Sequence, residues 1–209
     1  MERLAFGGAL ERARFAHVDA LRTCRSILLL GDGDGRFLER LLAAAPGARV
    51  HSVDASAAML ALAAARVAPA DRVRVKFENA DARTIALPLA AYDAVATLFF
   101  LDCFTPEETR ALVTRVAGSI RPGGQWLFAD FAVPEGGWRR CYSRVVVGGL
   151  YAFFRWRARI SARRLPDSER TIAGAGFRAE VSSTLAQGLL RSVLFRGETT
   201  SARIGDPGA

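Results

Sequence analysis

Cysteine is scarce in this sequence of 209 residues, which contains Cys24, Cys103 and Cys141 and no other. The three are widely spaced and odd in number, so the sequence predicts neither a disulfide framework nor a zinc site. Long apolar runs are missing as well, since none approaches the ~20 residues needed to span a bilayer. The first residues also lack the hydrophobic core of a signal peptide. We therefore expect a cytoplasmic protein of one domain that binds no metal.

Lysine is almost absent, because Lys76 is the single exception among 29 basic residues that are otherwise all arginine. The position of the arginines is more informative than their number. Residues 136–166 contain eight arginines and no acidic residue, whereas basic and acidic residues balance in the rest of the chain. This local excess of positive charge favours contact with an acidic partner or surface.

Short apolar runs alternate with helical periods along most of the chain, which is typical of a doubly wound α/β sheet. We expect strands at 26–30, 49–53, 73–77, 94–99 and 125–131, with helices at about 36–45 and 56–66. Met59, Leu60 and Leu62 are expected to give the second helix its apolar positions. A short helix from Asp167 should precede two strands that are joined at Gln187-Gly188 as a hairpin.

These elements predict a Rossmann-like sheet of about seven strands with helices on both faces. The sheet should be mostly parallel, with an antiparallel strand from the C-terminal hairpin. Residues 1–198 form a single domain in this interpretation, about 132–166 are a substrate-lid insertion, and 199–209 are a flexible tail.

The stretch "TPEETRALVTRVAGSIRPGG" has the clearest helix boundaries. Thr105 suits the N-cap, Pro106 the first helical position and Glu108 the reciprocal position of a capping box. Pro122 and the two glycines after it should end the segment and lead into the next strand.

Three glycines on alternate positions, Gly31, Gly33 and Gly35, join a strand to a helix in "SILLLGDGDGRFLERLL". Such a turn presents bare amide groups to a ligand, most often a nucleotide. A P-loop would need Lys followed by Ser or Thr, where this sequence has Arg36-Phe37. A dinucleotide turn would need its third glycine at Arg36, so an NAD(P)-dependent oxidoreductase remains an alternative, as does a nucleotide binder without catalytic activity.

The G-x-G-x-G spacing resembles that of the class I S-adenosylmethionine-dependent methyltransferases. The stretches "VHSVDASAAML", "ENADARTIALP", "YDAVATLFFLDCF" and "SIRPGGQWLFADF" resemble later motifs of the family in the same order. The stretches "DASAAML", "NADARTIALP" and "FADFAVPEGG" are loosely similar to the menaquinone and ubiquinone C-methyltransferases. The resemblance implies transfer of a methyl group from S-adenosylmethionine to a small-molecule acceptor.

The resemblance also implies which residues line the site. Asp54 would hold the ribose hydroxyls, and Asp81 and Ala82 would lie beside the adenine. The full set of cofactor positions is Gly31, Asp32, Gly33, Asp34, Gly35, Asp54, Ala55, Met59, Asp81, Ala82, Thr97 and Leu98. The acceptor would be lined by Phe99, Phe100, Asp130, Tyr142 and Tyr151.

The glycine turn departs from the family pattern in its acidic residues. Leu29 stands where relatives usually have an acid within the first strand, while Asp32 and Asp34 lie among the glycines. One hypothesis is that Asp32 pairs with the ammonium or sulfonium group of the cofactor. The alternative is that both carboxylates stabilise the N-terminus of the following helix through its dipole.

Methyl transfer is an in-line displacement, so a base is needed only if the acceptor must lose a proton. Asp102 is the first candidate for this acid or base, although it could instead be a loop acid that caps the helix beginning near Thr105. His17, in an N-terminal amphipathic segment, is the second candidate, although it could be a packed or surface histidine. Cys103 is interpreted as a small buried apolar residue.

Nucleic acid is disfavoured as a substrate because the fourth strand is not followed by the Asn-Pro-Pro-Tyr, Asp-Pro-Pro-Tyr or Pro-Cys motifs of nucleobase methylation. An RNA methyltransferase remains an alternative because the basic segment could bind phosphates. On a helical wheel, four arginines of residues 138–164 share one side and aromatic residues take the other. This pattern fits an anionic membrane surface, with the protein peripheral to its inner face, or an acidic amphiphilic substrate; a solvated helix face is the alternative. The sequence leaves the oligomeric state open.

Overall fold

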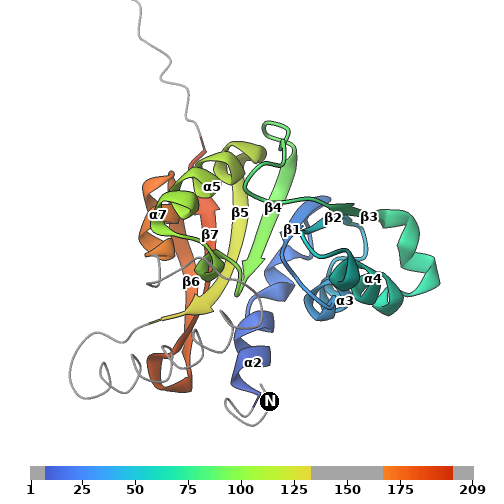
Figure 1. Ribbon diagram of the computed structural model, residues 1–209. Coiled ribbons are helices and arrows are strands. Elements are labelled where there is room, and N and C mark those ends of the chain that lie inside the picture. The colour runs from blue at the N-terminus through green and yellow to red at the C-terminus, as the bar shows by residue number, and fades with distance from the viewer. Residues whose placement is uncertain (1–7, 133–166, 200–209) are drawn as a thin grey trace, which may run out of the picture.

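The computed structural model describes residues 8–132 and 167–199, and seven strands form one sheet within these ranges. The strands are β1 (Ser26–Leu30), β2 (Arg49–Asp54), β3 (Val75–Asn79), β4 (Tyr92–Leu98), β5 (Ile120–Phe131), β6 (Phe177–Leu185) and β7 (Leu190–Gly197). The α-helices are α2 (Ala9–Phe15), α3 (Arg36–Ala44), α4 (Ala57–Arg66), α5 (Pro106–Ser119) and α7 (Ser168–Gly174). Short 3-10 helices are η1 (Val18–Leu21), η2 (Pro69–Arg74), η3 (Leu101–Cys103) and η4 (Ala186–Gly188). Figure 1 labels these five α-helices and the strands.

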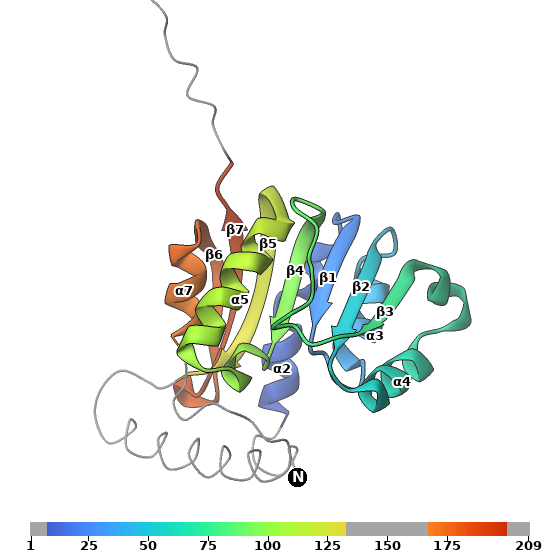
Figure 2. The same cartoon turned by 45° about the horizontal axis from the view of Figure 1, so that its top comes forward.

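The strand order across the sheet is β3-β2-β1-β4-β5-β7-β6, which can be followed in Figure 2. β1 pairs in parallel with β2 and with β4, and β2–β3 and β4–β5 are also parallel. β7 is antiparallel to both β5 and β6, so the last two strands form the expected hairpin. The prediction of a mostly parallel, seven-stranded sheet is confirmed.

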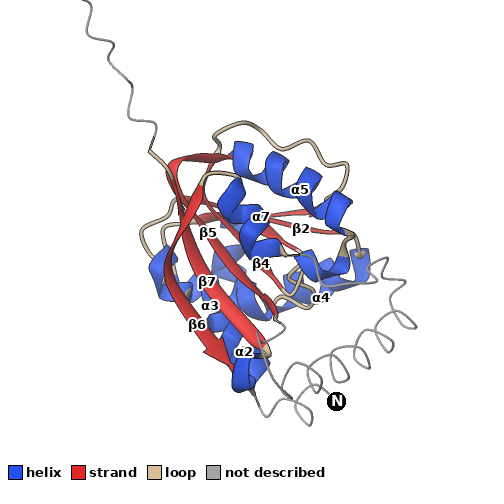
Figure 3. Ribbon diagram, turned by 90° about the vertical axis from the view of Figure 1, so that its left-hand side faces the viewer, coloured by secondary structure: helices blue, strands red, loops and turns tan. Residues whose placement is uncertain are grey.

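Helices cover both faces of this sheet, as the side view in Figure 3 shows. We call the face packed against α3, α4 and η1 the α3 face, and its core includes Leu29 and Leu127 from the sheet and Phe37 from α3. We call the opposite face, packed against α5 and α7, the α5 face, and its core includes Trp126. Alternate residues of each strand point to opposite faces, which explains the nearly continuous apolar runs of the central strands.

Helix α2 lies at the end of the sheet where the parallel strands finish (Figure 2). Its buried residues Ala9 and Ala13 pack with Leu189 and Leu190, at the start of β7. The N-terminal segment thus reaches the same edge of the sheet as the glycine turn.

Six boundaries of β1 to β5 differ from the sequence prediction by one to five residues, and three of them are informative. β3 begins at Val75, two residues later than predicted, because Pro69 starts η2 and Val73 is 91% exposed in that helix. β4 ends at Leu98, because Phe99 has a positive φ of 55°. β5 begins at Ile120 and includes the Pro-Gly-Gly segment that was expected to precede it.

Helix α4 buries a narrower face than its sequence indicates. Leu60 and Ala63 are buried, whereas Met59 is 39% exposed and Leu62 is 52% exposed. The prediction that all three apolar residues of this helix pack on the sheet was therefore wrong for Met59 and Leu62. Alanine is small enough to let α4 approach α3 closely, and Ala63 takes that position.

Much of the predicted lid and tail lies outside the described residues. This applies to residues 133–166, which include Tyr142 and Tyr151, and to residues 200–209. Within the described ranges, no helix has the length and apolar character needed to cross a membrane.

The capping box of α5 gives a direct test of local stability. The Thr105 side chain accepts a hydrogen bond from the Glu108 amide at 3.3 Å, and the Glu108 carboxylate accepts one from the Thr105 amide at 2.9 Å. We expect Thr105→Ala to lower the free energy of unfolding by about 1 kcal/mol, because the Glu108 amide loses its acceptor. Thr105→Ser keeps the hydroxyl and should stay near the wild type in urea denaturation. Equal losses for the two variants would contradict this assignment.

Candidate active site

The candidate active site lies where the parallel strands end. The Gly31 amide, just after β1, donates to the Val53 carbonyl in β2 at 2.9 Å, and the Ala80 amide after β3 donates to the Asp54 carbonyl at 3.2 Å. Three neighbouring strands therefore finish in register at one edge. Ligands of open α/β sheets bind outside this carboxyl edge.

The glycine turn has left-handed backbone at all three glycines, with φ angles of 66° at Gly31, 69° at Gly33 and 85° at Gly35. A Cβ atom on Gly31 would lie 2.1 Å from the Phe100 ring, and one on Gly35 would lie 2.5 Å from the Ala63 Cα. A Cβ atom on Gly33 would meet no atom within 4 Å. Packing thus requires the two outer glycines, whereas the middle one borders open space into which a ligand can approach the backbone.

Asp54 lies directly beside this middle glycine. One carboxylate oxygen accepts from the Gly33 amide at 3.2 Å, and the other accepts from the Ser56 amide at 2.8 Å. The side chain is partly buried at the end of β2. A carboxylate at this position suits a ribose, because it can accept hydrogen bonds from two adjacent hydroxyls. The turn and Asp54 together fit the nucleoside part of S-adenosylmethionine.

Asp32 interacts with the following helix. Its carboxylate accepts from the Phe37 amide at 3.3 Å and from the Leu38 amide at 2.9 Å, in the first turn of α3. Burial raises the pKa of Asp32 to about 6, against the effect of these two amides. These contacts are those of the helix-stabilising alternative. None of these contacts supports the hypothesis that Asp32 pairs with the ammonium or sulfonium group of the cofactor.

Asp34 belongs to an ion-pair network that the sequence did not predict. Its carboxylate contacts Arg36 at 3.0 Å and Arg66 of α4 at 2.9 Å, and Arg36 also contacts Glu11 of α2 at 3.3 Å. Burial raises the pKa of Asp34, but the two arginines outweigh that effect and lower it. The network connects the glycine turn to α2 and α4, which are distant from it in sequence. The one sign of it in the sequence is the cluster of charged residues at the turn.

The predicted adenine positions follow β3. The Asp81 carboxylate accepts hydrogen bonds from the Arg83 guanidinium, which lower the pKa of Asp81. The Ala82 side chain is buried in the core of the α5 face. Ala55 and Met59 follow β2, on the turn into α4 and in its first turn. Ala55 and Met59 thus follow Asp54 at the end of β2, while Asp81 and Ala82 follow the neighbouring end of β3.

The turn after β4 forms the wall opposite the glycines. The Phe99 amide donates to the Ala129 carbonyl at 2.7 Å, and its ring packs on Phe131 with a centroid distance of 5.3 Å. Phe100 lies against Gly31, because its ring occupies the space that a side chain on that glycine would need. The side chains of Thr97 and Leu98 are buried in the core. Those two residues can contact a cofactor only through their backbone.

Asp102 in η3 and Asp130 near the end of β5 are neighbouring buried carboxylates. Asp130 is 3% exposed, and its carboxylate accepts from the Asp102 amide at 3.1 Å and from the Phe131 amide at 2.8 Å. Burial and the nearby Asp102 raise the pKa of Asp130 well above its usual range. The Cys103 thiol donates to Asp102 at 3.6 Å, and burial followed by the two carboxylates raises its pKa. A raised pKa leaves little thiolate at neutral pH, which argues against a nucleophilic role for Cys103.

His17 is separated from these carboxylates by the sheet. Its Nε2 atom lies 3.3 Å from the Ser192 carbonyl of β7, beside the core of the α3 face. Asp130 alternates with Phe131 and points to the α5 face, as do Trp126 and Phe128. The structure thus does not bring the two predicted acid-base residues together. Within the described ranges, no group of three or more His, Cys, Asp or Glu side chains is placed to hold a metal ion.

Comparisons with known proteins agree with this site. A family profile described as a methyltransferase domain matches residues 27–124. A demethylmenaquinone methyltransferase from Thermus thermophilus is 33% identical over 156 residues, covering 70% of this chain and 69% of that protein. A ubiquinone/menaquinone biosynthesis C-methyltransferase from Syntrophotalea carbinolica is 30% identical over 185 residues, covering 84% of this chain and 75% of that protein.

Solved structures share the fold at lower identity. An O-methyltransferase family protein from Burkholderia thailandensis has a TM-score of 0.68 and 20% identity, covering 91% of this chain and 55% of that one. The chain therefore spans little more than half the length of that protein. The 1,6-didemethyltoxoflavin-N1-methyltransferase of the same organism, solved with S-adenosylhomocysteine, has a TM-score of 0.65 and 19% identity, covering 91% of this chain and 78% of that one. The sequence relatives, the strand order and the glycine turn beside Asp54 together show that the chain belongs to the class I S-adenosylmethionine-dependent methyltransferases.

Proposed function

We propose that this protein transfers a methyl group from S-adenosylmethionine to a small-molecule acceptor at the carboxyl edge of the sheet. The open space in front of Gly33, beside the Asp54 carboxylate, is the observation that carries this proposal. An oxidoreductase would need a third glycine in the position of Arg36, so the spacing of the glycines gives the NAD(P) alternative no support.

The chain's own residues would bind the cofactor, orient the acceptor and exclude water from the site. When bound, S-adenosylmethionine supplies a methyl group on a sulfonium sulfur, which an acceptor atom displaces in line. Asp54 and the amides of the glycine turn would hold the nucleoside, and Phe99 and Phe100 would wall the acceptor side. An acceptor that must lose a proton needs a base, and we propose Asp102 for this role rather than His17. Asp102 lies in η3, which follows β4, and its amide bonds to Asp130 near the end of β5, whereas His17 is bonded to β7 on the other face.

We infer that the acceptor is a lipophilic aromatic ring of the quinol type. The names of the Thermus and Syntrophotalea relatives support this, since both concern menaquinone or ubiquinone. The aromatic side chains of Phe99, Phe100 and Phe131 near the carboxyl edge supply matching apolar surface. Residues 138–164 would bring the protein to an anionic membrane through their arginines, a proposal that rests on the sequence of that segment. The RNA alternative rests on the basic segment alone, which lies outside the described residues.

Asp54→Asn should weaken binding of S-adenosylmethionine between about tenfold and a hundredfold. The variant keeps the shape and one acceptor oxygen but removes the charge, and a hydrogen bond to a charged group contributes roughly 1.5 to 3 kcal/mol. Isothermal calorimetry measures the affinity. Glu180→Gln, an acid-to-amide change on β6 far from the carboxyl edge, is the matched control and should bind as the wild type does. An unchanged affinity for Asp54→Asn would contradict the assigned role.

Two glycine variants should separate binding from folding. Both alanines meet the same left-handed strain of roughly 1 kcal/mol. Gly33→Ala adds no clash, so the protein should fold and lose cofactor affinity, because its methyl group occupies the ligand's approach. Gly35→Ala places a Cβ against Ala63 and should lose about 1 to 3 kcal/mol more stability through overpacking. Denaturation and calorimetry on both variants measure the difference, and similar behaviour of the pair would refute the distinct roles.

The acceptor proposal is tested with methyl-labelled S-adenosylmethionine and a reduced naphthoquinone that lacks its ring methyl group. Label should enter the quinol faster from anionic vesicles than from neutral ones, and added salt should remove the difference by screening. Changing Arg140, Arg144, Arg155 and Arg159 to Gln should abolish it, since each basic group contributes about 1 kcal/mol at an anionic surface. Arg178→Gln on β6 is the control. Equal methylation of a water-soluble phenol, with no effect of lipid, would overturn the quinol proposal.

A further inference from the structure

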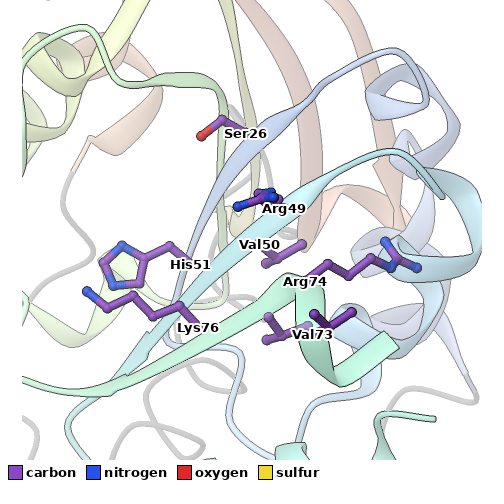
Figure 4. Close-up of a pocket in the computed structure, with 8 residues that line it drawn as sticks. Ser26, Arg49, Val50, His51, Val73, Arg74 and Lys76 are labelled. Atoms are coloured by element: carbon purple, nitrogen blue, oxygen red, sulfur yellow. The ribbon is translucent and has the colours of Figure 1, made fainter. Parts of the chain in front are cut away.

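A cavity lies at the amino edge of the sheet, at the opposite ends of the strands from the glycine turn. It has a volume of about 210 Å³ and is lined by the first residues of β1, β2 and β3 and the end of η2, shown in Figure 4. β1 alone separates the two edges by five residues, or roughly 16 Å. Methyl transfer at the carboxyl edge does not involve this cavity.

The strand register gathers polar side chains on one face of this corner. Ser26 is opposite Arg49 in the parallel ladder, and His51 is opposite Lys76. Arg49 and His51 are two residues apart on β2, so both project to the same face as their partners. The lining contains Arg49, Arg74 and Lys76 and no carboxylate. The cavity therefore concentrates hydrogen-bond donors of positive charge.

The two arginines of this cavity differ in their hydrogen-bond and ion-pair partners. Arg74 is turned toward the end of α3, where its guanidinium donates to the carbonyls of Leu42, Ala45 and Ala48 and also contacts Asp71. Figure 4 shows it extending away from His51 and Lys76. Arg49 is exposed, and its guanidinium has no hydrogen bond or ion pair with any residue in 8–132 or 167–199. This guanidinium is free to bind an anion.

His51 lines the cavity beside Lys76, and its ionisation depends on the charges around it. Its Nδ1 atom lies 2.7 Å from the Tyr92 hydroxyl, and its Nε2 atom lies 3.0 Å from the Glu78 carboxylate, which also pairs with Lys76 at 2.5 Å. Burial and the Lys76 charge lower the pKa of His51, against the effect of Glu78. Neutral imidazole can then donate to Glu78 and accept from Tyr92, which satisfies both ring nitrogens.

We propose that the amino-edge cavity is a binding site for a small phosphate-bearing anion. The Arg49 guanidinium offers the paired N–H groups that match phosphate oxygens, with the Lys76 ammonium and the Ser26 hydroxyl as further donors. Glu78 offsets the charge of Lys76, whereas no carboxylate of the described residues offsets the charge of Arg49. A bound anion would therefore neutralise Arg49. The volume of about 210 Å³ fits a single phosphate with a small attached group. Occupancy should not compete with the cofactor.

The two histidines of the chain make the site testable by nuclear magnetic resonance. Inorganic phosphate, titrated against chloride at equal ionic strength, should shift the ring signals of His51 saturably and raise its pKa, because the bound anion adds negative charge beside the imidazole. His17, bonded to β7 beside the core of the other face, should not respond. Arg49→Gln should weaken the response about tenfold or more. Arg178→Gln, which removes an exposed arginine of β6, should leave it unchanged.

Saturating S-adenosylhomocysteine should leave the phosphate titration of His51 unchanged, which separates this proposal from the methyltransferase function. Equal shifts of both histidines would show general screening and overturn the proposal. A wild-type response of Arg49→Gln would do the same. A response to a mixed-sequence RNA oligonucleotide but not to phosphate would indicate a polynucleotide surface, which also contradicts a small-anion site.

Discussion

Gly31, Gly33 and Gly35 hold the chain in left-handed backbone three times within five residues, and the geometry of the carboxyl edge depends on this turn. Its outer glycines let Phe100 and Ala63 approach so closely that no side chain fits between. These contacts fix the turn between β4 on one side and α4 on the other. The middle glycine is then held next to Asp54 with its backbone uncovered. A chain with any Cβ at the outer positions would have to move a strand turn or a helix to form the same edge.

The acidic residues of the edge have divided tasks. Asp32 and Asp34 satisfy groups of the protein itself, namely two amides of α3 and two arginines. Asp130 accepts amides at the ends of β5 and η3, which fixes the turn carrying Phe99 and Phe100. Asp54 also accepts two amides, and one of them belongs to Gly33, where an added Cβ atom would meet no atom within 4 Å. We therefore propose separate roles for these acids, in which Asp32, Asp34 and Asp130 shape the edge and Asp54 also binds the nucleoside.

Much of this arrangement follows from the sequence because it depends on local patterns. The capping box at Thr105 and Glu108 and the hairpin at Gln187-Gly188 are encoded by residues within a few positions of each other. The boundary of β3 was not predictable from apolar character, because Val73 is apolar but belongs to η2. The contacts of Asp34 with Arg66, and of Asp102 with Asp130, join segments about 30 residues apart. Such pairings depend on how whole helices and strands pack against one another. The sequence could therefore supply alternative roles for these carboxylates, but it could not decide between them.

The central claim is that the turn and Asp54 form a site for S-adenosylmethionine rather than for a dinucleotide. Thermal unfolding in the presence of each ligand tests this most directly, since a ligand that binds only the folded protein raises the melting temperature. S-adenosylmethionine and S-adenosylhomocysteine should each raise it in proportion to the logarithm of their concentration above the dissociation constant, and NADH should not. Stabilisation by NADH alone would contradict the account.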